Sequence, residues 1–132
     1  MLPWVGFFFC HLSSARIGKS MSRTGTVGTS TIDEAAVAEA SKEEVSSLKA
    51  AITSINRLRP KFVVACGPFT DEVHGSTGGN GDSDTNTNTL HAVQTALFRR
   101  NICRVSDSIS LLFVPSPHEM GVSEDNNQLV PT

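Results

Sequence analysis

The 132-residue chain has no tyrosine, a single tryptophan and only three cysteines. Cys10, Cys66 and Cys103 are odd in number, lie far apart in the sequence, and stand in or beside apolar runs. This pattern favours reduced thiols over a disulfide framework or a zinc site. We therefore expect a reducing compartment, with the cytoplasm as the first expectation.

The sequence also lacks an excess of basic residues and any long apolar run. Its formal net charge is −2 at pH 7. Nucleic-acid binding relies on Lys and Arg to neutralise phosphates, so this balance argues against it. The most apolar stretch, residues 2–12, is shorter than the roughly 20 residues that span a bilayer, and it contains Gly6 and His11. We expect neither a nucleic-acid partner nor a membrane span.

Acidic residues are missing from the first 32 positions, which carry Arg16, Lys19 and Arg23 among many Ser and Thr. That composition resembles a transit peptide, so mitochondrial targeting is the alternative to the cytoplasm. A secretory signal ending at residues 13–15 is a second alternative, although no positive charge precedes its apolar stretch. The simplest interpretation is a buried first strand followed by a polar loop.

Three short apolar runs are typical of strands buried in a sheet. Val5–Cys10 contains three consecutive Phe, Phe62–Cys66 is rich in Val, and Ile109–Val114 is the third run. Continuous apolar runs of this length are expected where a strand is covered on both faces. We predict a strand at each.

Two helices are predicted between these strands. Ser41 and Glu44 have the spacing of a capping box, and apolar residues then recur at intervals of three and four as far as Leu58. Pro60 should end this helix, because the residue before a proline disfavours helical geometry. Helical spacing returns over residues 90–100, which end in two arginines.

The order strand, helix, strand, helix, strand predicts an α/β fold with a mostly parallel sheet. A chain of this length forms one domain, so residues 1–132 are taken as a single unit. Residues 16–40 are rich in Ser, Thr, Gly and Ala, residues 75–89 are rich in Ser, Thr, Gly and Asn, and we predict flexible loops at both. Functional side chains are expected where the strands end, at residues 12–18, 67–72 and 115–121.

Several segments of the chain carry motifs of a known family. Residues 51–61 read AITSINRLRPK and lead into FVVACGP at 62–68, while residues 114–121 read VPSPHEMG. Near the start, FFF at 7–9 precedes SARIG at 14–18. These segments are similar to the calcineurin-like metallophosphoesterases, and most to the small Ser/Thr phosphatases with a calcineurin-like phosphoesterase domain. There, a motif like AINKLxPK leads into FFVLCGD, a later strand leads into VSGNHDIG, and the first strand precedes DPQFG.

The resemblance covers most of the chain and implies a truncated metallophosphoesterase-type domain with degenerate metal motifs. In the family, an Asp, a bridging Asp and an Asn bind two metal ions, and a His protonates the leaving oxygen. The aligned metal positions here hold Ser14, Pro68 and Pro117. Proline has no side-chain donor or acceptor, and serine is a poor ligand for a catalytic divalent metal. His118 remains as the candidate general acid, and Glu119 stands where the family has the Asp that orients it.

The resemblance thus implies a divergent, inactive phosphatase-like protein with no cofactor. An active form would be a metal-dependent phosphoric ester hydrolase that uses manganese, iron or zinc on a phosphoprotein or another phosphate ester. The alternative is a non-catalytic interaction protein or remnant that keeps only the α/β scaffold. In that case a protein partner would cover the part of the sheet that a truncated domain leaves exposed.

Three other patterns invite a functional interpretation, and each has a simpler one. Asp71 and Glu72 could replace the missing bridging ligand, but they come three and four residues too late and are expected to be solvated charges. Gly18-Lys19-Ser20 resembles the end of a P-loop, yet Ser13 stands where that motif requires glycine. A weak metal site could form from His74, His91, Asp82 and Asp84. The simpler explanation is that these residues belong to a flexible polar loop.

Overall fold

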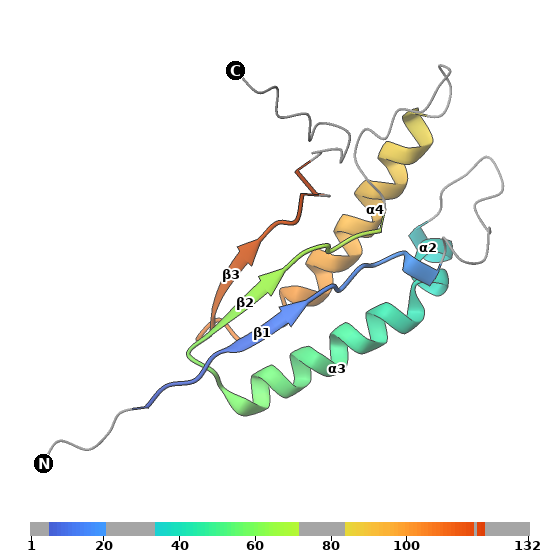
Figure 1. Cartoon of the computed structure of the whole chain (residues 1–132). Coiled ribbons are helices and arrows are strands. Elements are labelled where there is room, and N and C mark those ends of the chain that lie inside the picture. Colours follow the sequence, from blue (N-terminus) through green and yellow to red (C-terminus); the bar gives the residue numbers. More distant parts are fainter. Residues whose placement is uncertain (1–5, 21–33, 72–83, 118, 121–132) are drawn as a thin grey trace, which may run out of the picture.

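The computed structural model describes residues 6–20, 34–71, 84–117 and 119–120. Along the chain, the elements are β1 (Cys10–Ser13), α2 (Glu34–Ala40), α3 (Lys42–Leu58), β2 (Phe62–Cys66), α4 (Asp84–Ile102) and β3 (Ser110–Val114). Strands and helices alternate (Figure 1), which confirms the predicted α/β class.

The three strands form one sheet in the order β1-β2-β3, and both pairings are parallel. His11, Val64 and Leu112 stand side by side across its middle row. The prediction that the second and third strands are parallel neighbours is confirmed. α3 connects β1 to β2, and α4 connects β2 to β3.

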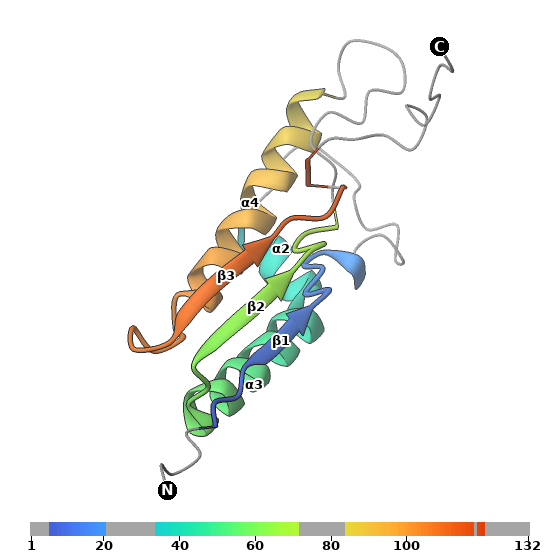
Figure 2. The ribbon, with the colours of Figure 1, turned by 60° about the vertical axis from the view of Figure 1, so that its left-hand side comes forward.

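All three helices lie on the same face of this sheet, as the two ribbon views show (Figures 1 and 2). Val63 and Ala65 point toward the helices and have no exposed surface. They pack in a core that the helices and the strand connections complete. The buried apolar members of that core are Ile17, Val37, Leu48, Ile52, Ile55, Val63, Leu90, Leu97, Phe98, Ile102, Val105 and Ile109.

α3 follows its predicted bounds, but its N-terminus is not capped as predicted. Its apolar side buries Leu48, Ile52 and Ile55. At its other end, Arg59 adopts a left-handed φ of 53° and its N–H donates to the Ile55 carbonyl, a common way for a helix to end. The expected capping box is wrong, because the Ser41 side chain makes no capping hydrogen bond. α2 runs directly into α3, and the Ser41 N–H donates to the Val37 carbonyl instead.

Three sequence-based boundaries are also wrong. The first strand is Cys10–Ser13 rather than Val5–Cys10, so most of the aromatic run precedes the strand. The segment 16–40 contains α2, and α4 begins at Asp84, inside the segment 75–89 that was expected to be a loop. The remainders of these two loop predictions, 21–33 and 75–83, lie outside the described residues.

The side of the sheet opposite the helices is not covered by any described element. We call it the open face. Phe9 and Phe7 belong to it because their rings lie 5.0 and 6.3 Å from that of Phe62. Strand alternation places the remaining members on the same side. The open face comprises Phe7, Phe9, His11, Ser13, Phe62, Val64, Cys66, Ser110, Leu112 and Val114.

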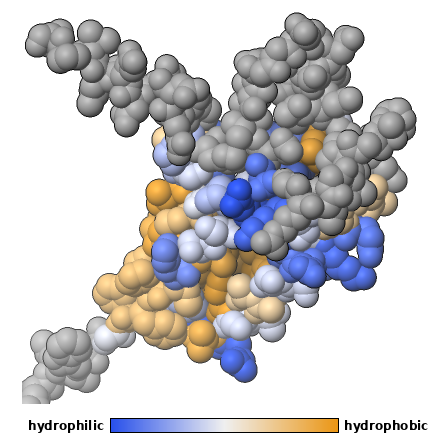
Figure 3. Space-filling view, turned by 45° about the vertical axis from the view of Figure 1, so that its right-hand side comes forward, coloured by the Kyte–Doolittle hydropathy of each residue, from blue (hydrophilic) through white to orange (hydrophobic). Residues whose placement is uncertain are grey.

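Large apolar side chains are exposed on and around the open face. Phe7 is 70% exposed, Phe9 55% and Leu112 52%. Figure 3 shows hydrophobic atoms over the lower left of the described surface, with hydrophilic atoms toward the right. The prediction that the first and third apolar runs are covered on both faces is therefore wrong, and of the third run only Ile109 is fully buried. No helix of the described chain combines the length and apolarity needed to cross a bilayer.

Replacing Gly18 should test how tightly the connection after β1 packs on α4. Gly18 is buried with a φ of 104°, and an added Cβ would overlap the side-chain amide of Gln94. We expect Gly18→Ala to lower the free energy of unfolding in urea by about 1–3 kcal/mol. Gly6→Ala is the matched control, because no atom lies within 4 Å of its Cβ position. Equal stability of the two variants would contradict this packing.

Candidate functional site

The loops after β1 and β2 continue to pair beyond the strands. The Ser14 N–H donates to the Cys66 carbonyl at 3.2 Å, and the Ile17 N–H donates to the Phe69 carbonyl at 2.9 Å. The Asp71 N–H in turn donates to the Ile17 carbonyl at 2.9 Å. The two connections therefore run side by side across the carboxyl edge of the sheet, where ligands of α/β proteins usually bind.

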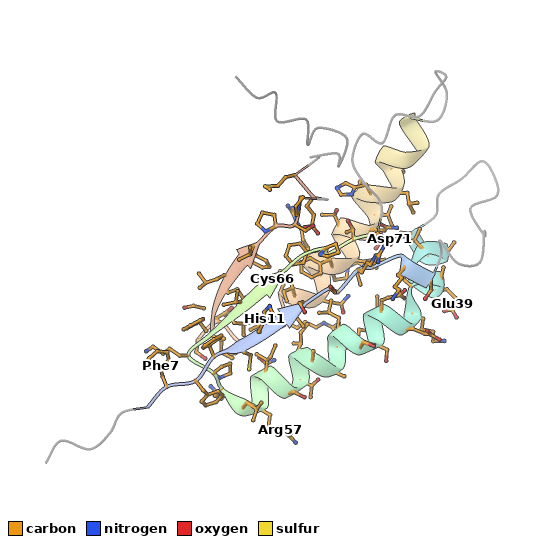
Figure 4. All side chains as sticks on the ribbon, in the orientation of Figure 1. Phe7, His11, Glu39, Arg57, Cys66 and Asp71 are labelled. Atoms are coloured by element: carbon orange, nitrogen blue, oxygen red, sulfur yellow. The ribbon has the colours of Figure 1, made fainter. Side chains whose placement is uncertain are left out.

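An ion pair joins the same two loops. Nε of Arg16 donates to Oδ1 of Asp71 at 2.7 Å, and Figure 4 shows Asp71 at the end of the sheet opposite Phe7. The Asp71 side chain is only 8% exposed, so its interpretation as a solvated charge is wrong. The Arg16 side chain is 47% exposed, and solvent screening limits such a pair to about 1 kcal/mol.

Glu119 joins the loops after β2 and β3. Its Oε2 accepts a hydrogen bond from the Ser116 N–H at 2.7 Å and another from the Ser116 hydroxyl at 2.8 Å. Its Oε1 accepts a hydrogen bond from the Phe69 N–H. The carboxylate lies directly against Gly67, where any Cβ would overlap it. Glu119 thus acts as an internal anion that ties two strand ends together.

The sequence carried a signal for this role that motif matching missed. Ser116-Pro117-His118-Glu119 has the S-x-x-E spacing of a capping box, with proline at the first helical position. In the structure, the Glu119 carboxylate reaches back to the Ser116 N–H, as in half of that arrangement. The Met120 N–H donates to the Ser116 carbonyl at 3.2 Å, which completes one helical turn.

The structure brings together only some of the residues that align with the metal ligands of the family. Ser14 is exposed and has a left-handed φ of 55°, Pro68 is half-buried, and Pro117 is exposed. Glu119 is held beside Pro68 by its bond to the next residue, whereas the candidate acid His118 lies outside the described residues. Within the described residues, no three His, Cys, Asp or Glu side chains gather where they could hold one ion.

The segment that resembles the end of a P-loop is occupied by contacts within the chain. Ser20 donates to Oε1 of Glu44 from its N–H at 2.6 Å and from its hydroxyl at 2.7 Å. Gly18 packs against Gln94 rather than standing open to a phosphate. Of the weak metal site, Asp84 and His91 belong to α4, whereas His74 and Asp82, like Glu72, lie outside the described residues.

Comparison with protein-family models, with curated proteins and with solved structures finds no match. The resemblance to the calcineurin-like metallophosphoesterases therefore stays a prediction, and it rests on the motifs quoted above.

A double-mutant cycle between Gly67 and Glu119 should show whether the carboxylate occupies this position. We expect Gly67→Ala alone to destabilise the protein by about 1–3 kcal/mol, because its Cβ displaces the Glu119 carboxylate. In a Glu119→Ala background the same change should cost much less, giving a coupling of about 1 kcal/mol or more in urea unfolding. Additive effects of the two substitutions would show that the carboxylate lies elsewhere.

Proposed function

We propose that the chain is a non-catalytic α/β protein that works by binding a protein partner through its open face. Its resemblance to the calcineurin-like metallophosphoesterases is then a likeness of scaffold without the metal chemistry. The observation that carries this proposal is the exposure of Phe7, Phe9 and Leu112 on a parallel sheet. Such sheets are almost always covered on both faces.

The carboxyl edge supports the non-catalytic half of the proposal. A two-metal hydrolase needs a bridging carboxylate and several further ligands around one crevice. Pro68 and Pro117 cannot supply a side-chain ligand. Both oxygens of Glu119 already accept hydrogen bonds from Phe69 and Ser116, so using this carboxylate as a ligand would break those bonds.

The chemistry of the open face supports the binding half. Aromatic side chains are enriched at the centres of protein interfaces, and charged residues are depleted there. The open face contains three Phe and no Asp, Glu, Lys or Arg. Its only titratable groups are the His11 imidazole and the Cys66 thiol.

Metal content and hydrolysis test the non-catalytic half. We expect the purified chain to bind no stoichiometric manganese, iron or zinc. We also expect it to hydrolyse phosphoproteins and model phosphate esters no faster than a His118→Ala variant, because the ligands that would hold the metals are missing. Elemental analysis and a phosphate-release assay measure the two quantities.

Restoring two of the lost ligands is the matched control. Pro68→Asp combined with Pro117→Asn should still give little activity, because Ser14 remains and Glu119 is engaged with Phe69 and Ser116. Two metal ions per chain, or hydrolysis that His118→Ala abolishes, would contradict the proposal. Either result would mean that the chain is a metal-dependent phosphoesterase with ligands supplied by other residues.

A further inference from the structure

The side chains of the open face stand in register across three adjacent strands. His11, Val64 and Leu112 form its middle row, and Ser13, Cys66 and Val114 form the row toward the carboxyl edge. The stacked rings of Phe9 and Phe62 lie at the amino end, with an interplanar angle of 5°. A partner therefore meets three adjacent strands at once.

The two sides of β2 differ in burial. On β2, Val63 and Ala65 face the helices with no exposed surface, whereas Phe62, Val64 and Cys66 alternate with them on the open face and keep part of theirs. On β3, Leu112 and Val114 on the open face are 52% and 49% exposed, and Phe113 on the helix side is 49% exposed. Keeping apolar side chains exposed to water is unfavourable, so burying them against a partner would stabilise the complex.

The area of the open face matches what each partner of a stable complex buries. A fully exposed aromatic side chain offers about 200 Å² and smaller apolar ones somewhat less. At the exposed fractions of Phe7, Phe9, Leu112 and Val114, these four side chains present on the order of 400 Å². The other members bring the face to the order of 700 Å², close to the roughly 800 Å² that each side of a standard interface buries.

The open face carries no formally charged side chain, and this favours a second copy of the chain as its partner. Two like charges brought together in a dry interface cost several kcal/mol, so most surfaces cannot face a copy of themselves. The ten residues of the open face include no Asp, Glu, Lys or Arg, so a copy of the face can pack on it without such repulsion. A partner with a charged binding surface would gain no ion pair from the open face, because the face has no charged side chain to pair with.

We propose that the open face binds a second copy of this chain, sheet against sheet, so that the helices of both copies lie on the outside. This inference rests on the proposed binding function and names its partner. Two sheets packed in this way interleave their side chains about 10 Å apart. The resulting dimer is a sandwich of two sheets between two helical layers, and it covers the second face of each parallel sheet.

Symmetry places Val64 at the centre of the contact. A twofold contact is isologous, so the same surface patch is used on both copies. β2 is the central strand and Val64 is its middle residue, in register with His11 on one side and Leu112 on the other. A twofold axis through the middle of the face brings Val64 of the two copies together.

Sedimentation equilibrium across a range of concentrations tests the dimer. We expect the full chain to be a dimer at high concentration that dissociates on dilution. Leu112→Lys should shift it to monomer, because it introduces a charge into the interface. Leu58→Lys is the matched control: Leu58 is also 52% exposed but lies on α3, on the other side of the sheet, and this variant should associate like the unchanged chain.

Opposite charges at Val64 identify the partner as a second copy. Val64→Lys and Val64→Glu should each be monomeric, because like charges would meet at the axis, and an equimolar mixture should form a one-to-one complex. Circular dichroism checks that each variant is folded. The dimer is refuted if the unchanged chain stays monomeric at every concentration, if Leu112→Lys associates as Leu58→Lys does, or if the Val64 mixture stays monomeric while both variants are folded.

These outcomes are separable from failure of the proposed function. A monomeric chain that binds no metal and hydrolyses no phosphate ester would refute the second copy as partner and leave the non-catalytic proposal standing. Hydrolysis that depends on His118 would refute the proposed function whatever the association state.

Discussion

The structure depends on one constraint: a parallel sheet needs both faces covered, and here the described helices cover one. The cause lies in the strand order. Right-handed crossovers place each connecting helix on a face set by the direction in which the next strand is added. Because β1, β2 and β3 are added in the same direction, α3 and α4 lie on the same side of the sheet. A doubly wound sheet covers both faces by reversing that direction, and these three strands contain no reversal.

The carboxyl edge, where such folds usually bind ligands, is held closed by the chain's own polar groups. Arg16 and Asp71 join the first two loops, and Glu119 joins the second loop to the third. A carboxylate that accepts three hydrogen bonds from backbone and hydroxyl donors is positioned to hold loops in place. Among the described residues, these contacts hold the loops at the edge of the sheet, while the open face carries exposed apolar side chains.

The alternation of apolar runs was enough to predict the α/β class, the parallel sheet, β2, α3 and β3 within a residue or two. β1 was misplaced because hydrophobicity alone favoured Phe7–Phe9, whereas the strand pairs through His11 and Ser13, whose side chains face outward. The start of α4 was missed because Thr and Asn are poor helix formers. Ser41 and Glu44 have capping-box spacing, but α2 runs into α3 there, so tertiary context overrode a local pattern.

Hydroxyl-radical footprinting of the unchanged chain, read by mass spectrometry at low and high protein concentration, tests the central claim most directly. At low concentration Phe9 and Leu112 should be oxidised readily, while Phe98, 6% exposed in the core, should be protected. At high concentration Phe9 and Leu112 should become protected, whereas Leu58 on α3 should not change. Ready oxidation of Phe9 and Leu112 at every concentration would contradict the account, because no second copy would then cover the open face.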